Sequence, residues 1–205
     1  MRSADARDAE PRGRHGRPPA RAPAARERIL DAARRRFAAD GVYAATLDDV
    51  RRDAGVSVGA VYHHFPDKER LAEAVWLDAL ERYQEGFLAA LRAHPDARGG
   101  VVAGVEHHLR WVADNRDDAA LLLSARPAAA APRNRAFFAA VRAWWEEHAR
   151  AGALRDYDLD LVHALWLGPS QEYCRHWLAG RARRVPRAVA RELAEAAWQS
   201  LKGPA

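Results

Sequence analysis

The strongest constraint on the fold is a helical spacing of apolar residues that starts near Pro23 and continues to the C-terminus. Apolar residues recur at intervals of three and four, and no stretch alternates apolar and polar residues as a half-buried strand would. Gly, Pro and capping residues divide this region into segments. The sequence therefore predicts an all-α protein of about nine helices, with no sheet. The predicted helices cover residues 24–40, 47–54, 58–64, 68–93, 97–114, 117–125, 133–150, 158–179 and 186–202.

The first 22 residues differ from the rest in composition. They contain three prolines, six arginines and almost no apolar side chains. Such a segment cannot bury enough surface to offset the entropy of ordering it. We therefore predict a disordered basic tail over residues 1–22. It lacks the apolar block of a secretory signal.

Composition also limits the class of protein. The 205 residues are 49% hydrophobic and 30% charged, which is typical of a folded chain. No apolar run reaches the roughly 18 residues that cross a bilayer, so we expect no membrane association. The single cysteine, Cys174, cannot form a disulfide within the chain, and a reducing cytoplasmic location is expected. A net charge of +5 permits nucleic-acid binding without requiring it.

Residues 47–64 have the pattern of two short helices joined by a tight turn. Thr46 and Ser57 are placed to cap the two helices, and Gly55 allows a sharp turn between them. Gly59 lies inside the second helix, where glycine costs about 1 kcal/mol relative to alanine. A close approach of this helix to DNA would explain that cost, and the alternative is that Gly59 is merely tolerated. The pattern predicts a helix-turn-helix, whose second helix enters the major groove while the first spans the backbone.

The wider sequence around this pattern carries a resemblance to a known family. The run from Thr46 to Leu71, with its Ala54-Gly55-Val56-Ser57 turn, resembles the DNA-binding domain of TetR-family transcriptional repressors. Residues 29–41 match that family's first helix, and the whole resemblance covers residues 26–72. Beyond these residues the chain is similar to the family in architecture only. The resemblance implies a helix-turn-helix domain over residues 23–67 and an effector-binding and dimerisation domain over residues 68–205.

The resemblance also implies contacts with a double-stranded DNA operator. Hydroxyl and ammonium groups suit phosphates, while small and apolar side chains can pack on thymine methyl groups. The recognition helix has no Arg, Asn or Gln. We therefore hypothesise that specificity depends on His63, apolar contacts, DNA shape and neighbouring arginines. The implied phosphate contacts are Thr46, Tyr62 and Lys68, and the implied groove residues are Ser57, Val58, Gly59, Ala60 and His63.

Arg51 departs from the family pattern, which usually has alanine at this close contact between two helices. The arginine must run outward along the helix surface or push the helices apart, or it could add a phosphate contact. We favour the outward path. Acidic and basic residues are nearly balanced in the predicted DNA-binding domain, so the basic groups must cluster on one face. The candidates for that face are Arg26, Arg28, Arg51, Arg52 and Lys68. For Arg26 and Arg28 the alternative is the solvated face of an amphipathic helix.

The C-terminal part is rich in large aromatic residues. Most of them are expected in the core, since aromatic stripes at helical spacing usually pack inside. The resemblance implies a small-molecule cavity between the middle helices, and side chains with an apolar body and a polar edge suit such a cavity. For each candidate the alternative is a plain core or surface position. The predicted ligand-binding residues are His107, His108, Trp111, Trp144 and His148.

No metal, cofactor or catalytic site is predicted. His107 and His108 are adjacent and so point about 100° apart on a helix. The chain has no pair of histidines four residues apart, no Ser-His-Asp or Cys-His arrangement and no phosphate loop. We therefore expect a protein that is not an enzyme.

The last two predicted helices carry apolar stripes, and the resemblance implies that they form a homodimer interface. A two-fold dimer also suits DNA, because two recognition helices can then read two half-sites. We expect Gly168 and Pro169 to kink or break the helix over residues 158–179. The alternative is that both stripes close the core of one subunit. The predicted interface residues are Trp166, Gly168, Tyr173, Trp177, Val189, Leu193 and Ala197.

These observations predict a homodimeric repressor that binds a palindromic operator and is released by an effector. The effector must bind the two states with different affinity, and the long helix over residues 68–93 would link cavity and DNA. The alternative is a DNA-binding regulator of the same fold without a small-molecule effector. A filled C-terminal core would favour that alternative.

Overall fold

The structure is a computed structural model that describes residues 24–123 and 127–204. The described residues form ten α-helices and one 3-10 helix, and an isolated bridge between Leu154 and Lys202 is their only strand-like pairing. The all-α prediction is confirmed. The predicted disordered tail lies outside the described residues. The helices are α1 (Ala25–Ala44), α2 (Leu47–Ala54), α3 (Val58–His64), α4 (Lys68–Arg92), α5 (Ala97–Asp114), α6 (Arg116–Leu122), α7 (Ala130–Arg150), α8 (Leu159–Trp166), α9 (Gly168–Leu178), η1 (Pro186–Val189) and α10 (Ala190–Leu201).

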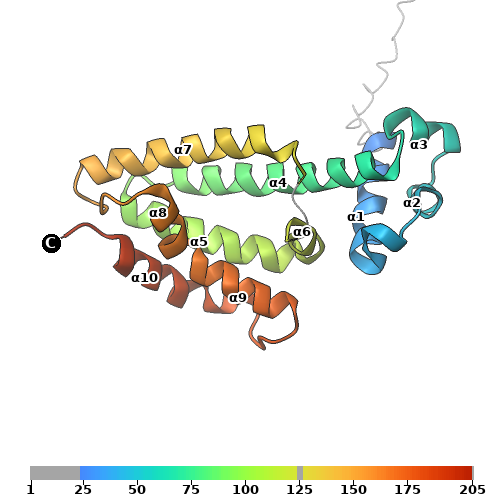
Figure 1. Ribbon diagram of the computed structural model, residues 1–205. Coiled ribbons are helices and arrows are strands. Elements are labelled where there is room, and N and C mark those ends of the chain that lie inside the picture. Colours follow the sequence, from blue (N-terminus) through green and yellow to red (C-terminus); the bar gives the residue numbers. More distant parts are fainter. Residues whose placement is uncertain (1–23, 124–126, 205) are drawn as a thin grey trace, which may run out of the picture.

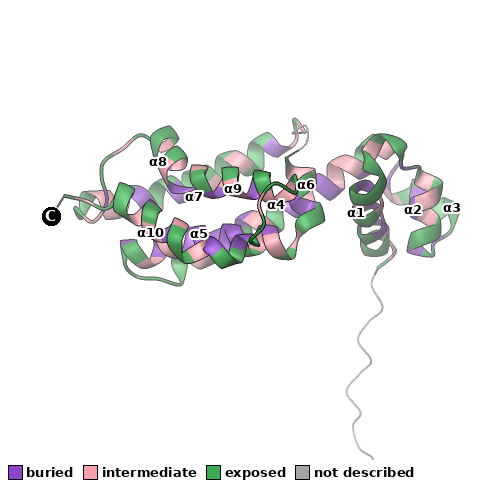
Figure 2. Cartoon of the chain, turned by 90° about the horizontal axis from the view of Figure 1, so that it is seen from below, coloured by how far each residue is buried: buried purple, intermediate pink, exposed green. Residues whose placement is uncertain are grey.

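Figure 1 shows two lobes of unequal size joined by α4. The smaller N-terminal lobe holds α1, α2 and α3. The larger C-terminal lobe holds α5 to α10, with α7 lying along α4 and with α9 and α10 on the opposite side of α5. Buried residues face the interior of each lobe, as the purple positions in Figure 2 show. Each lobe therefore has its own apolar core.

The N-terminal lobe is built on the predicted apolar face of α1. Gly41, the predicted stop of the first helix, has non-helical dihedral angles with a φ of 80°, so α1 kinks there and one short further turn follows. Glycine tolerates this left-handed conformation at little cost. The side chains of the predicted caps Thr46 and Ser57 accept backbone hydrogen bonds at the starts of α2 and α3, and that of Asp67 does so at the start of α4. The buried α1 residues are Ile29, Leu30, Ala32, Ala33 and Phe37.

Helix α4 belongs to both cores. Its first turns bury Leu71 and Val75 among the residues of α1, α2 and α3. Its last turns bury Phe87 and Leu91 among the residues of α5 and α7 to α10. A continuous helix that is packed at both ends connects the two lobes mechanically.

The C-terminal lobe is packed around α5. Gly100 lets α5 approach α7 closely, since a Cβ at this position would overlap the indole of Trp144. The Trp166 indole N–H of α8 donates to the Val101 carbonyl of α5 at 2.9 Å. These contacts satisfy the one polar atom of a buried aromatic side chain and fix the position of α8.

The predicted break at Gly168-Pro169 is found, and two helix starts differ from the prediction by three or four residues. The segment 158–179 is broken at Leu167 into α8 and α9, and Pro169 occupies the first turn of α9. The segment 186–202 begins with a 3-10 turn before α10. Helix α7 starts at Ala130, before the predicted start at residue 133. Pro132 is tolerated there because first-turn N–H groups have no helical partner.

No helix in the described part of the chain is both long enough and apolar enough to span a membrane.

Candidate functional site

The turn between α2 and α3 is fixed by local hydrogen bonds. Gly55 ends α2 in the left-handed conformation with a φ of 62°. The Thr46 hydroxyl accepts from the Asp49 N–H at 3.1 Å and contacts the Asp49 carboxylate at 2.6 Å. The Ser57 hydroxyl accepts from the Ala60 N–H at 3.2 Å. Together these bonds hold two short helices that could not be stable alone.

Helix α3 exposes the face predicted to read DNA. Val58 and Tyr62 are each 55% exposed, and His63 is also exposed, whereas Val61 on the opposite face is buried. An apolar or aromatic side chain left in water is informative, because such residues usually pack inside. Ser57 and Gly59 are exposed and Ala60 is partly exposed.

Tyr43 at the end of α1 was not predicted from sequence. Its side chain is 97% exposed, and its carbonyl accepts a hydrogen bond from the Lys68 ammonium group at 2.9 Å. Tyr43 lies outside the helix-turn-helix pattern of residues 47–64, so the spacing of that pattern does not identify it as a site residue. The contact with Lys68 places it beside one of the predicted phosphate-binding groups.

The predicted basic residues of α2 are paired with carboxylates. Arg51 contacts Asp48 at 2.7 Å, and Arg52 contacts both Asp48, at 2.5 Å, and Asp49, at 3.3 Å. These arginines lower the pKa of Asp48 by hydrogen bonding to its carboxylate. Arg51 therefore takes the outward path along the helix surface and does not separate α2 from α3. Phosphates would have to compete with these carboxylates for the arginines.

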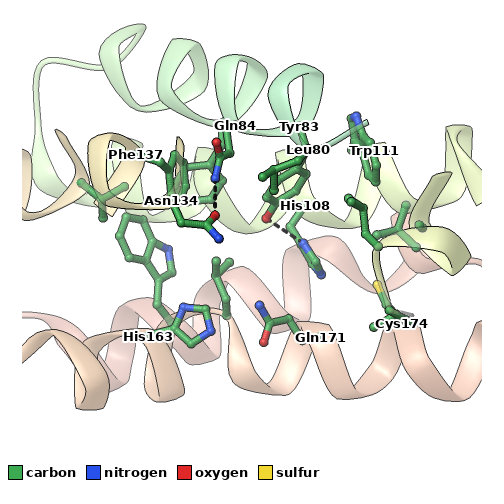
Figure 3. A pocket seen from close by; sticks show the side chains of 18 of the residues that line it. Leu80, Tyr83, Gln84, His108, Trp111, Asn134, Phe137, His163, Gln171 and Cys174 are labelled. Atoms are coloured by element: carbon green, nitrogen blue, oxygen red, sulfur yellow. Dashed lines mark hydrogen bonds between the residues drawn. The ribbon is translucent and has the colours of Figure 1, made fainter. Parts of the chain in front are cut away.

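A cavity of about 350 Å³ lies in the C-terminal lobe between α4, α5, α6, α7, α8 and α9 (Figure 3). Its volume falls at the lower end of the range of small-molecule sites. Aromatic and aliphatic side chains form most of its wall. The described polar residues that line it are Tyr83, Gln84, His108, Asn134, His163, Gln171, Cys174 and Arg175.

Two of the five predicted ligand-binding residues, His108 and Trp111, line this cavity. His107 does not, because its Nε2 atom lies 3.1 Å from the Tyr83 carbonyl of α4, on another face of α5. Trp144 stacks on Trp166 with ring centroids 5.6 Å apart, and the His148 ring meets Trp144 edge-on at 4.6 Å. His107, Trp144 and His148 therefore pack against neighbouring residues outside the cavity wall.

Two polar pairs in the cavity wall were missed by the sequence analysis. The Tyr83 hydroxyl lies 3.0 Å from His108 Nδ1, and Gln84 Nε2 donates to Asn134 Oδ1 at 2.9 Å (Figure 3). Gln84 shares the buried stripe of α4 with Leu80 and is itself buried. A glutamine on an otherwise apolar stripe was the available signal.

Burial keeps three titratable groups of the cavity wall neutral: His108, Tyr83 and Cys174. It lowers the pKa of His108 to about 4, with smaller contributions from the charges of His107 and His163. It raises the pKa of the Tyr83 hydroxyl and raises that of the Cys174 thiol to about 12. Near neutral pH the imidazole, the phenol and the thiol are all uncharged.

The predicted interface residues separate into two groups. Trp166, Val189 and Ala197 are buried in the core of the C-terminal lobe, so the alternative that these stripes close one subunit's own core is correct for them. The apolar stripe of α10 faces α5, to which α10 is packed. The other four lie partly at the surface: Gly168, Tyr173, Trp177 and Leu193.

An ionic cluster joins the two lobes. Asp118 of α6 is 3% exposed and contacts Arg34 of α1 at 2.9 Å and Arg82 of α4 at 2.7 Å. Asp78 of α4 contacts the same two arginines at 2.7 Å and 3.1 Å. Helix α6 also contributes Ala119 and Leu122 to the cavity wall. The same short helix thus touches both the cavity and the N-terminal lobe.

The described residues contain no group of three or more His, Cys, Asp or Glu side chains that could hold a metal ion.

The architecture is that of a helix-turn-helix regulator with a separate helical domain. Residues 29–75 match the family described as "Bacterial regulatory proteins, tetR family". The chain is 54% identical to the HTH-type transcriptional regulator SrpR of Pseudomonas putida over 50 residues, which are 24% of each chain. The match thus spans only about a quarter of this relative.

Solved structures cover far more of the chain. A bacterial regulatory protein in the tetR family from Rhodococcus RHA1 matches with a TM-score of 0.72 and 26% identity, covering 88% of this chain and 98% of that one. FadR from Bacillus subtilis, solved in complex with stearoyl-CoA, matches with a TM-score of 0.71 and 17% identity, covering 83% and 96%. Residues 29–75 thus match the DNA-binding domain of the tetR family, and the chain as a whole has the fold of tetR-family regulators of known structure.

Proposed function

We propose that this chain is a cytoplasmic, homodimeric repressor that binds a palindromic operator and is released by a small molecule in the cavity of the C-terminal lobe. The observation that carries the proposal is the combination of an exposed α3 with a cavity that contacts the N-terminal lobe through α6. In this proposal residues 23–67 bind DNA, and residues 68–205 bind the effector and dimerise.

Helix α3 supports the DNA-binding half of the proposal. Its outward face presents Val58, Tyr62 and His63 to solvent, and its caps hold it rigidly against α2. A rigid, protruding helix can enter a major groove without a change in the fold. Lys68, at the start of α4, lies where the backbone of the same duplex would pass.

The cavity supports the effector-binding half. An unfilled, largely apolar space with a few convergent polar groups is typical of ligand sites. A filled core would have favoured the alternative of a regulator without an effector. FadR from Bacillus subtilis, a protein of the same fold, was solved in complex with stearoyl-CoA, and this precedent of a bound small molecule supports the proposal.

The route from effector to DNA would pass through α6 as well as α4. A ligand that displaces Ala119 or Leu122 also moves Asp118 on the same helix turns. Asp118 is bound to Arg34 of α1, so this displacement reaches the N-terminal lobe directly. The effector must bind the DNA-free arrangement more tightly, since equal affinity for both would shift nothing.

The test begins with selection of bound sequences from a random pool of duplex DNA by the full chain. We expect an inverted repeat to be enriched. His63→Ala should then change the ranking of operator variants, while His176→Ala, an exposed histidine on α9, should leave it unchanged. An enriched sequence without two-fold symmetry would contradict the dimeric reading. A variant ranking unaffected by His63→Ala would contradict the proposed role of α3.

The effector half is tested with the selected operator. A library of small molecules is screened for release of the labelled duplex, measured by fluorescence anisotropy. Active compounds should lose their effect when Val141→Trp fills the cavity, whereas the exposed Ala139→Ser on the same helix should respond as the wild type does. Release that persists in the filled variant would place the effector elsewhere.

A further inference from the structure

Either group can donate the hydrogen bond between Tyr83 and His108, depending on the tautomer of the imidazole. The Tyr83 hydroxyl stays protonated because burial raises its pKa, and His108 Nδ1 lies 3.0 Å from it. We take the hydroxyl as the donor, because in the reverse arrangement its hydrogen would also lack a partner among the described residues. The proton of the neutral imidazole then sits on Nε2, on the side away from Tyr83.

That donor has no partner. His108 is only 8% exposed, and its Nε2 atom is buried without a hydrogen bond to any described residue. Figure 3 shows the ring directed into the cavity, between α4 and the α8–α9 side that carries His163, Gln171 and Cys174. Buried donors are normally satisfied, so an exception in a cavity wall indicates a ligand.

A second donor in the same wall is also unpartnered. Trp76 of α4 lines the cavity, is 4% exposed, and leaves its indole Nε1–H without a partner among the described residues. The two orphan groups are both donors. A ligand that satisfies them must bring hydrogen-bond acceptors.

The inner wall offers no counter-ion for a charged ligand. None of the described lining residues is Asp, Glu or Lys. Arg175 is cationic, but its side chain is 55% exposed at the solvent edge of the cavity and is hydrogen-bonded to the Glu172 carboxylate. A charge carried past Arg175 to the inner wall would lose its hydration without finding a partner. The aromatic rings of Phe87, Phe137 and Trp166 instead favour a flat apolar body.

We propose that the effector is a compact, uncharged, largely aromatic molecule whose oxygen acceptor takes a hydrogen bond from His108 Nε2–H. This inference rests on the proposed function, in which the cavity is the effector site. It adds the chemical class of the ligand and the residue that selects it.

The test compares four probes of nearly the same shape by equilibrium dialysis against the full chain at pH 7.5. They are 2-acetylnaphthalene, 2-isopropenylnaphthalene, 2-naphthoate, and the trimethyl-2-naphthylammonium cation. The ketone and the alkene differ in one atom group, C=O against C=CH₂, so their ratio isolates the acceptor. We expect the ketone to bind at least tenfold more tightly than the alkene and than either ion.

The variant that tests the donor is Tyr83→Phe/His108→Phe, which removes both members of the pair and leaves no orphan hydroxyl. We expect it to bind the alkene as the wild type does and to lower the ketone preference below threefold. The matched control is His163→Phe, which removes an imidazole from the same cavity and should keep the tenfold preference. Binding of the alkene shows that the variant cavity is still folded.

Four results would overturn the inference: no binding of the ketone, equal binding of ketone and alkene by the wild type, tighter binding of either ion, or an unchanged ketone preference in the double variant. The proposed function is judged separately by release of the selected operator. A ketone that binds through His108 without releasing DNA contradicts the effector role, and the inferred ligand class stands.

Discussion

The two lobes differ in how far their functional polar side chains are buried and paired. At the surface of the N-terminal lobe, Arg51 is partly exposed, Arg52 is exposed, and both are paired with carboxylates. In the cavity of the C-terminal lobe, the Nε2 atom of His108 and the Nε1 atom of Trp76 are buried and unpaired, and both side chains are neutral. The first arrangement suits a charged partner that exchanges one ion pair for another. The second arrangement suits a neutral partner that supplies hydrogen-bond acceptors for the two unpaired N–H donors.

Salt concentration should affect operator binding far more than binding of the neutral ketone, and this is the largest expected difference between the lobes. Release of counterions from DNA makes the affinity fall steeply with salt, and about six cationic contacts in a dimer predict a loss of about 10³-fold between 50 and 200 mM. Binding of the neutral ketone probe should change less than twofold. Operator and ketone titrations over the same salt series check this. A steep salt dependence of ketone binding would remove the contrast between the lobes.

Acid should destabilise the C-terminal lobe through His108. The folded pKa of about 4 lies below the ordinary value of 6.5, so the unfolded chain binds the proton more readily. Stability is then full above pH 6.5 and is lost as the pH falls towards 4, by about 3 kcal/mol. Urea unfolding at pH 7 and pH 4.5 measures this loss. It should be smaller by about 2 kcal/mol in Tyr83→Phe/His108→Phe, and an equal loss would show that other groups cause it.

Loss of the carboxylate that joins the lobes should have a somewhat smaller effect. Asp118→Asn leaves Arg34 and Arg82 without their buried partner, and since both arginines are partly exposed we expect a cost of about 2 kcal/mol. Urea unfolding measures it. The exposed Asp160→Asn should change stability by less than about 0.5 kcal/mol. If Asp118→Asn left the free energy of unfolding unchanged, the cluster would not hold the lobes together.

The smallest effect is expected from the cap of α2. Thr46→Ala removes the hydroxyl that accepts from the Asp49 N–H and should cost about 1 kcal/mol of stability. Thr46→Ser keeps that hydroxyl and should cost a few tenths at most. If the hydroxyl also binds a phosphate, Thr46→Ala should weaken operator binding more than the stability loss explains, as anisotropy titration would show.

The features that local sequence determines were predicted best. The caps Thr46, Ser57 and Asp67 act within three residues of themselves, so their roles follow from spacing alone. The apolar face of α1 was also predicted correctly. The break before Gly168 was expected because proline cannot continue a preceding turn.

Features that depend on distant contacts were predicted only in part. His107 and His108 looked equivalent in sequence, and only the packing of α4 against α5 decides that His108 faces the cavity. An apolar stripe such as that of α10 cannot reveal whether it meets its own subunit or another. Trp166 and Ala197 therefore entered the predicted interface although they are core residues. The Tyr83–His108 pair required the same non-local information.

The sharing of α4 has a consequence for how the molecule comes apart. Leu71 and Val75 complete the smaller core, so a fragment that ended at residue 67 would lack one wall of its interior. Unwinding of either end of α4 removes apolar contacts from the core that contains that end. It also destabilises the other core, because both cores share this helix. Fluorescence of a dye on α1 and absorbance of the tryptophans in the larger lobe should therefore report one common transition on heating.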